Sequence, residues 1–176
     1  RGIMAQGKVD LLKTLSGGKW KAIGTDRRAG LLAPLFSVYS KNSVGIGDLG
    51  DLKLLVDLCE KTGCSILQLL PMNEIGATFC PYDAVSSFAL EPAYISLSAI
   101  PSADDKAIKA RIERIKKFVP AGRGHVDYAI REEKRQVLLD MFIAEGTAAP
   151  GYKKFTESNK YWLDDFALYK AIKNHN

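Results

Sequence analysis

A strand–helix–strand pattern in residues 30–71 restricts the fold of this chain more than any other feature. Apolar residues predict a first strand from Leu31 to Phe36, and the polar segment SKNS then leads to a glycine turn. Residues 52, 55, 56 and 59 are apolar at helical spacing, which predicts a helix over 48–61 with Asp48 as its N-cap. The segment SILQLLP is nearly all apolar, which is typical of a strand buried on both faces. Such a βαβ unit predicts the α/β fold class.

The glycine turn GIGDLG, residues 45–50, matches the G-x-G-x-x-G spacing of a dinucleotide-binding loop. A strand precedes it, a helix follows it, and Glu74 lies at about the distance expected for an acid that binds a ribose. Three features oppose this interpretation: SKNS separates the strand from the turn, Asp48 would repel a pyrophosphate, and Pro71 intervenes before Glu74. Asp48 suits the unpaired amides and the dipole of a helix N-terminus. We therefore favour a structural turn.

Composition limits the remaining function classes. The chain has 176 residues, 47% of them hydrophobic and 26% charged, which predicts a globular domain with a core. The apolar runs are too short for a membrane span or a signal peptide. The net charge of +5 is spread over helical segments mixed with acids, which argues against nucleic acid as a partner. Three cysteines without a C-x-x-C pair indicate neither a disulfide framework nor a metal site, so we expect a reducing compartment and no cofactor or metal.

The second half of the chain predicts helices after a long loop. Residues 71–93 form a segment longer than a simple connection between two elements needs, and long loops in compact domains are usually functional or disordered. YISLS at 94–98 is compatible with a short strand. Helices are predicted after Pro101, over 127–145 and over 156–173. Their expected buried residues are Ile108, Ile112 and Ile115 on the first, Val137, Leu138, Met141 and Phe142 on the second, and Trp162, Phe166, Tyr169 and Ile172 on the third.

Four segments in the same order resemble a known family. They are RAGLLAPLFSVYSKNSVGIGDLGDLKLLVDLCEKTGCSILQLLPMNE, CPYDAVSSFALEPAYISL, VDYAIREEKRQVLLDMF and NKYWLDDFALYKAIK. Together they resemble the N-terminal region of 4-α-glucanotransferases, the amylomaltases or disproportionating enzymes of glycoside hydrolase family 77. The resemblance runs from about Arg28 to the C-terminus, and LLAPLFSVYSKNS is similar to the branch that includes plant cytosolic enzymes.

The resemblance implies the N-terminal portion of a (β/α)8 TIM barrel with a helical insertion. It divides the chain into a polar N-terminal extension (1–27), a first βαβ unit with an active-face loop (28–100), and a helical insertion with a return helix (101–176). The active face of such barrels is built from the loops that follow the strands. The remainder of the barrel is expected from downstream sequence. Because two or three strands leave open parallel edges, we expect the chain alone to be marginally stable, oligomeric or accompanied by other segments.

The chemistry that the resemblance implies is a retaining transfer of α-1,4-glucan segments between maltooligosaccharides, in a cytoplasmic or plastid setting. The family's catalytic carboxylates lie on later barrel strands and none of the acids here matches them, so we assign no catalytic residue and expect this chain alone to be inactive. Tyr82 matches the family tyrosine that packs against a glucose ring, although a core position is the alternative. Cys80 replaces the serine before Pro-Tyr, and a thiol is a weak hydrogen-bond donor. The further candidates for sugar contacts are Asp83, Asn73 and Glu74.

Two other functions remain open from the sequence. The first is a non-catalytic carbohydrate-binding or regulatory fragment of this length, which would use the same Tyr82 surface. The second is a dinucleotide-binding oxidoreductase domain built on GIGDLG. Stabilisation by a maltooligosaccharide would favour a carbohydrate function, whereas stabilisation by a nucleotide would favour the oxidoreductase.

Overall fold

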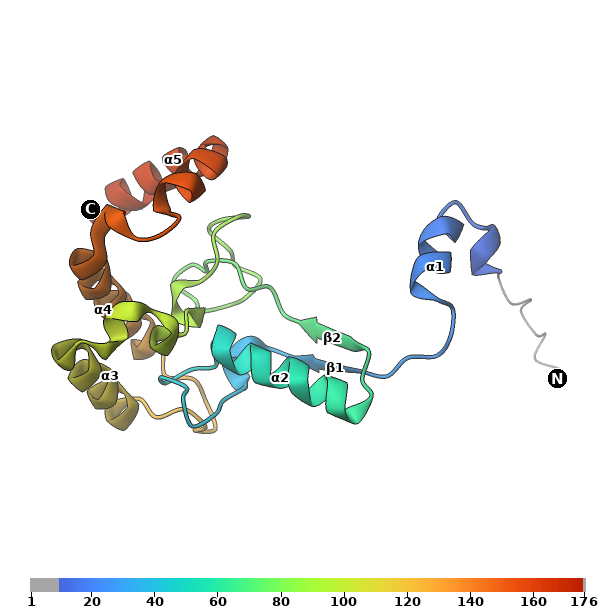
Figure 1. Cartoon of the computed structure of the whole chain (residues 1–176), viewed down its shortest axis with the longest axis horizontal. Helices are drawn as coiled ribbons and strands as arrows, with labels where there is room; N and C mark the ends of the chain where they lie inside the picture. Colours follow the sequence, from blue (N-terminus) through green and yellow to red (C-terminus); the bar gives the residue numbers. More distant parts are fainter. Residues whose placement is uncertain (1–9, 176) are drawn as a thin grey trace.

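The computed structural model describes residues 10–175, and side chains up to residue 174 (Figure 1). The regular elements, joined by short 3-10 helices, are α1 (Gly17–Ile23), β1 (Gly30–Ala33), α2 (Leu49–Thr62), β2 (Ile66–Leu69), α3 (Lys106–Phe118), α4 (Ala129–Glu145) and α5 (Tyr152–His175). The molecule is elongated: α1 lies at one end, the strands and α2 lie in the middle, and α3 to α5 form the other end. The predicted extension 1–27 therefore contains the short helix α1, while its first nine residues lie outside the described part of the chain.

The strands β1 and β2 confirm the predicted βαβ unit. They pair in parallel, from Gly30 opposite Ile66 to Ala33 opposite Leu69, and α2 connects them. The prediction that the first strand reaches Phe36 is wrong, because β1 ends at Ala33, directly before Pro34. Proline has no amide hydrogen to extend the ladder, and the chain turns into a 3-10 helix over Leu35–Ser37.

The second strand is not buried on both faces, which corrects another prediction. Its exposure alternates along the strand, and Ile66 is 48% exposed. Leu32 on β1 is 63% exposed. The physical reason is that the sheet has two strands in the described part of the chain, so alternate side chains on its surface have nothing to pack against.

The glycine turn ends in a capping box, as the position of Asp48 predicted. Its side-chain Oδ1 accepts hydrogen bonds from the amides of Gly50 at 2.8 Å and Asp51 at 3.4 Å, and Asp51 Oδ2 accepts from the Asp48 amide at 3.0 Å. The first amides of α2 are therefore already paired with carboxylates. A pyrophosphate would need those same donors, which argues against the dinucleotide interpretation.

The hydrophobic core lies between the glycine turn, the segment 92–99, α3 and α4. As predicted, Ile108, Ile112 and Ile115 of α3 are at most 8% exposed. Val137 and Met141 of α4 are also buried. Leu138 is partly buried against the core, whereas the prediction that Phe142 is buried is wrong.

Phe142 is 49% exposed because it follows Met141 and projects about 100° around the helix from that buried neighbour. The strand predicted at 94–98 is also absent: this segment forms 3-10 helices at Pro92–Tyr94 and Leu97–Ala99. Tight turns let Ala93, Tyr94 and Leu97 all enter the core, which an alternating strand would not allow.

Helix α5 contains the predicted helix but contributes less to the core than expected. Tyr169 and Ile172 are 42% and 54% exposed, while Trp162 and Phe166 are partly buried. Trp162 stacks on Phe88 of the long loop, with ring centroids 5.5 Å apart and planes 15° apart. Helix α5 thus packs mainly on that loop. No helix between residues 10 and 175 is long and apolar enough to cross a membrane.

Candidate functional site

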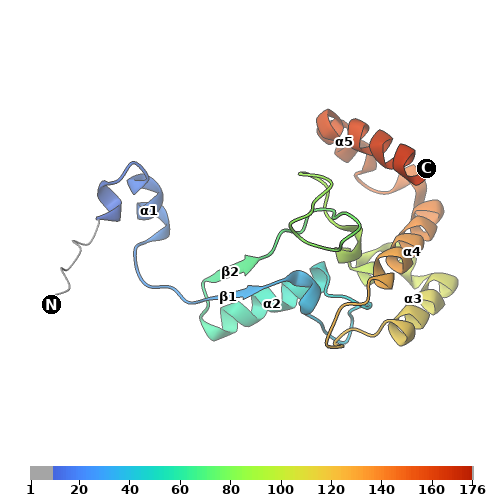
Figure 2. The same cartoon turned by 180° about the vertical axis from the view of Figure 1, so that it is seen from behind.

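The loop after β2 is a folded structure held by its own backbone. Near its base, the Glu91 amide donates to the Met72 carbonyl at 3.0 Å, and the Glu74 amide donates to the Ala89 carbonyl at 2.8 Å. Further out, the Val85 amide donates to the Glu74 carbonyl at 2.8 Å. The two arms of the loop therefore pair with each other for most of their length. Figure 2 shows the loop extending from the end of β2 towards α5.

Tyr82 lies at the exposed tip of this loop. Its side chain is 73% exposed, so the alternative of an ordinary core position is excluded. Three residues before it, Phe79 has a φ of 52°, a backbone conformation that bulky residues rarely adopt. The Phe79 ring packs on Tyr128 of the segment before α4, with centroids 4.8 Å apart. This contact fixes the backbone on one side of the tip and leaves the Tyr82 ring available to solvent.

The other candidates near the tip have polar partners within the loop. Asp83 is exposed and its Oδ2 accepts a hydrogen bond from the Thr78 hydroxyl at 2.8 Å. The Cys80 carbonyl accepts from the Asp83 amide at 2.9 Å, which closes a turn around Tyr82, and the thiol is partly buried. Asn73 lies lower in the loop, where its backbone bridges to Leu90. The structure therefore gathers Cys80, Tyr82 and Asp83 at one place and leaves Asn73 nearer the sheet.

Glu74 is the buried member of the candidate set. It is 4% exposed, its carboxylate contacts the Lys170 ammonium of α5, and an Arg131 nitrogen lies 3.7 Å away. Buried carboxylates are stable only with such charged partners. Glu74 therefore links the loop to α5 as well as facing the neighbouring cavity.

Arg131 of α4 is an organising residue that the sequence interpretation missed. Its guanidinium donates to the fully buried Glu91 carboxylate at 3.0 Å and to the Gly76 carbonyl at 2.8 Å. Glu91 in turn accepts from the Ile75 amide at 3.2 Å. The pKa of the Tyr94 hydroxyl is raised to about 12, mainly by the burial of Tyr94 and secondly by the negative charge of Glu91. The sequence offered one signal for this ion pair, an arginine on the predicted helix 127–145 and a glutamate before Pro92. The two residues are 40 positions apart, so their contact could not be predicted from local spacing.

A cavity of about 720 Å³ lies between the loop, α4 and α5. Its walls combine the rings of Phe79, Tyr128 and Phe166 with charged side chains from all three segments. Of the five predicted site residues, Glu74 alone lines it, so the exposed ring of Tyr82 belongs to a separate surface. The charged side chains in its lining are Glu74, Glu91, Arg131, Glu132, Arg135, Lys170 and Lys173.

A second buried polar cluster fastens the glycine turn to α4. Lys134 is 0% exposed, and its ammonium nitrogen lies 3.7 Å from Asp48 Oδ2 without a hydrogen bond to any described residue. Burial lowers the pKa of Lys134 from 10.5 to about 8, although Asp48 and Asp51 oppose that shift. The Ser43 hydroxyl completes the cluster by donating to Asp51 Oδ2 at 2.7 Å.

The described residues offer no ready metal site, since no three His, Cys, Asp or Glu side chains between residues 10 and 174 gather closely enough to hold an ion. The groups exposed at the loop tip can contact a polar ligand through an aromatic face and hydrogen bonds. An exposed phenol presents an apolar face and a hydroxyl, and nearby Asp83 and backbone groups supply acceptors.

Comparison with known proteins gives one family. The family model described as 4-alpha-glucanotransferase matches residues 33–176. A 4-alpha-glucanotransferase of Chlamydia pneumoniae is 35% identical over 164 residues, which cover 89% of this chain and 30% of that protein. The 4-alpha-glucanotransferase DPE2 of Oryza sativa is 33% identical, over 84% of this chain and 16% of the plant protein. The chain thus spans less than a third of the length of these relatives.

Solved structures give the same result for the fold. An amylomaltase from Streptococcus agalactiae, in complex with acarbose, superposes with a TM-score of 0.62 at 26% identity, covering 85% of this chain and 30% of that one. An amylomaltase from Corynebacterium glutamicum superposes with a TM-score of 0.58 at 25% identity, over 65% of this chain and 18% of that one. Both likenesses cover a minor part of the larger enzymes.

Proposed function

This chain belongs to the 4-alpha-glucanotransferase family, and we propose from that premise that it supplies a sugar-binding wall to an enzyme of that activity. The reaction would transfer α-1,4-glucan segments between maltooligosaccharides by retaining double displacement, through a glycosyl-enzyme formed on a carboxylate. The catalytic carboxylates would lie outside these 176 residues. The observation that carries the proposal is the 73% exposed ring of Tyr82 on a loop that its own hydrogen bonds hold in shape.

The proposed setting for this wall is the active face of a (β/α)8 barrel. In that arrangement residues 28–100 form the first βαβ unit and an active-face loop, and 101–176 form a helical insertion and a return helix. The parallel pairing of β1 and β2 and the exposed Leu32 and Ile66 support it, because barrel closure would add strands and cover apolar surface. The GIGDLG turn and the loop after β2 both follow the C-terminal ends of strands, where barrel enzymes place their sites.

Within the proposed site, Tyr82 would pack its ring against the C–H face of a glucose unit. Asp83 would accept a hydrogen bond from a sugar hydroxyl through the carboxylate oxygen that Thr78 leaves free. Cys80 offers a thiol in place of a hydroxyl, so its contact to sugar would be weak or made by its backbone. Asn73 would contact sugar from its position nearer the sheet, and Glu74 would do so only from the neighbouring cavity that it lines. The three free thiols support a reducing compartment, the cytosol or the plastid.

The experiment compares Tyr82→Ala with Tyr82→Phe in the chain and in the longest natural protein that contains it. Titration calorimetry with maltoheptaose measures binding, and maltotriose disproportionation measures transfer. We expect Tyr82→Ala to weaken binding at least tenfold and Tyr82→Phe to retain most of it, because the ring face makes the main contact. Tyr152→Ala, at the start of α5, is the matched control. Equal affinity of Tyr82→Ala and the unchanged protein would refute the assignment.

A second candidate function is a non-catalytic glucan-binding segment that acts at this length. The same exposed Tyr82 favours it, since binding needs no carboxylate pair. The two candidates separate in one assay: glucan binding without disproportionation by any natural protein that contains the segment would favour the second, and disproportionation would favour the first.

A further inference from the structure

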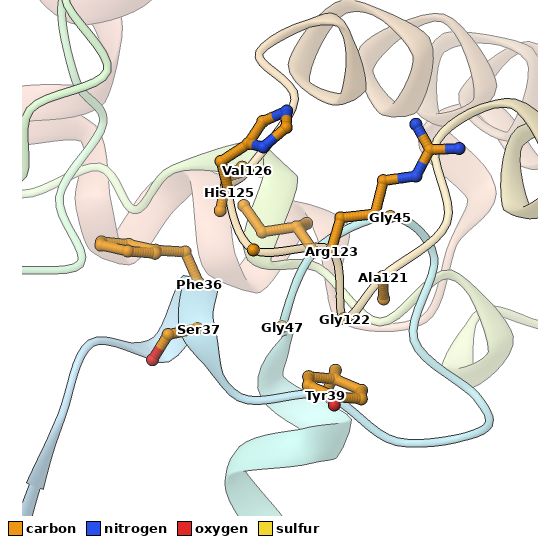
Figure 3. A pocket seen from close by; sticks show the side chains of 12 residues that line it. Phe36, Ser37, Tyr39, Gly45, Gly47, Ala121, Gly122, Arg123, His125 and Val126 are labelled. Carbon is orange, nitrogen blue, oxygen red and sulfur yellow. The ribbon is translucent and has the colours of Figure 1, made fainter.

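A smaller cavity lies beside the glycine turn, apart from the loop after β2, and the proposed function does not use it. It has a volume of about 170 Å³ and lies between the segment 36–47 and the segment 121–126, which precedes α4 (Figure 3). Its base includes the Phe36 and Tyr39 side chains and the backbone of the glycine turn. In Figure 3 the side chains of Arg123 and His125 rise from the second segment on the side opposite Tyr39.

The side chains around this cavity are cationic or neutral. Its lining includes Arg123, His125, Ser37 and Tyr39 and no Asp or Glu, and the Ser37 hydroxyl already donates to the Pro34 carbonyl at 2.8 Å. Neither Arg123 nor His125 forms an ion pair with any residue between 10 and 174. The nearby acids of the turn, Asp48 and Asp51, are already engaged with helix amides and Lys134. The cavity therefore carries a local excess of hydrogen-bond donors.

The backbone of the second segment has no regular pairing. The amides of residues 122–126 donate to no backbone acceptor in the described part of the chain. Glycines bring the two segments together: a Cβ on Gly122, whose φ is +80°, would lie 2.7 Å from the Tyr39 ring. A Cβ on Gly45 in the glycine turn would lie 2.9 Å from the Val119 carbonyl oxygen, just before the second segment. The close approach needs bare backbone at both positions, and bare backbone can contact a small ligand directly.

We propose that this cavity binds a small dianion, either orthophosphate or the phosphate ester of a sugar. Arg123 would supply the planar guanidinium that matches two phosphate oxygens, and His125 and the amides would supply further donors. A neutral sugar fits less well, because its hydroxyls need acceptors as well as donors, and arginine has none. The bound anion would link the segment 121–126 to the glycine turn on the proposed active face.

The test measures binding to the 176-residue chain by titration calorimetry with sodium phosphate, glucose 1-phosphate and glucose at constant ionic strength. We expect saturable binding of phosphate and none of glucose. Arg123→Gln should weaken phosphate binding at least tenfold, and His125→Gln severalfold. Arg114→Gln is the matched control, since Arg114 is an exposed arginine on α3, and it should leave binding unchanged. Both Arg123 and His125 are exposed, so these variants should fold.

The outcomes separate the two sources of the anion. Glucose 1-phosphate that binds at least tenfold more tightly than orthophosphate identifies a sugar phosphate as the ligand, and equal affinity identifies free phosphate. Absence of saturable phosphate binding would overturn the proposal, as would glucose binding as tightly as phosphate. Equal weakening by Arg114→Gln and Arg123→Gln would also overturn it, because the attraction would then be a general effect of charge. The readout needs no transferase activity, so its failure leaves the proposed function untouched.

Discussion

The helical end of the molecule and its two-stranded sheet differ in how they bury apolar side chains. Between the glycine turn, α3 and α4, residues such as Ile46, Ile130 and Val137 are at most 1% exposed. On the sheet, Leu32 and Ile66 are 63% and 48% exposed, although both belong to strongly apolar strands. Apolar composition alone therefore does not make a core. A side chain is buried only when other elements of the fold cover it.

Because of this difference, the two regions contribute unequally to the free energy of unfolding. Each Å² of apolar surface removed from water contributes about 25 cal/mol, so the helical end has most of the stabilising burial. A segment with little burial opens at a low free energy. The sheet thus depends on whatever covers it, while the helical end is held by its own contacts.

The largest effect is expected at Ile130 in the helical end, which is 0% exposed and packs closely against Gly45. Replacing it with alanine leaves a cavity in the core, and we expect a loss of roughly 2–5 kcal/mol in the free energy of unfolding. Urea unfolding followed by circular dichroism measures it. The matched control is Ile143→Ala on the same helix, 73% exposed, which should cost under about 0.5 kcal/mol. Equal losses would show that α4 does not bury one face in solution.

Lys134 makes the stability of the helical end depend on pH, because it is a cation buried in the best-packed region. Its pKa is lowered to about 8 in the folded chain from an ordinary value of 10.5. Between these values the unfolded chain binds more protons, so stability should rise with pH across this window. We expect a gain of about 2 kcal/mol from pH 7.5 to 9.5, measured as the urea unfolding free energy.

The control for this prediction is Lys134→Met, which removes the titrating group and keeps a similar length. The rise should disappear in that variant, whereas a contribution from any other group would persist in both. The Tyr94 hydroxyl, with its pKa raised to about 12, acts in the opposite direction above about pH 10 and therefore lies outside the interval. An identical rise in both proteins would assign the effect to groups other than Lys134.

The smallest effect is expected on the sheet. Leu32→Ala removes a side chain that is 63% exposed, so its cost in the isolated chain should stay below about 0.5 kcal/mol at low protein concentration. Sedimentation equilibrium should accompany the unfolding measurement. A cost above about 1.5 kcal/mol that grows with protein concentration would show that the sheet is covered by another copy of the chain.

Local signals in the sequence predicted several elements, and non-local contacts explain the misses. Asp48 allowed the start of α2 to be predicted, because an N-cap interacts only with residues in the first turn of its helix. The isoleucines of α3 showed their buried face for the same reason. In contrast, the segment 94–98 forms 3-10 turns because α4 packs against it, and no pattern within five residues reveals that contact.

The candidate site shows the same division. The exposure of Tyr82 agrees with a ligand-contacting role, and the role itself stays a prediction. Arg131 and Glu91, which hold the loop, were missed because their contact depends on how α4 is placed. Arg123 and His125 carry no motif at all, and only the fold shows that they face a cavity with the glycine turn.

The loop after β2 has one more consequence for how such a surface could diversify. The Arg131 guanidinium donates hydrogen bonds to the carbonyl oxygens of Ile75 and Gly76, and the two arms of the loop pair through their backbones. Neither contact involves the side chains at positions 80 and 82, whereas the Asp83 side chain also accepts a hydrogen bond from Thr78 inside the tip. Positions 80 and 82 can therefore change while the loop keeps its shape, so a designer who wished to alter ligand preference could vary these two positions together.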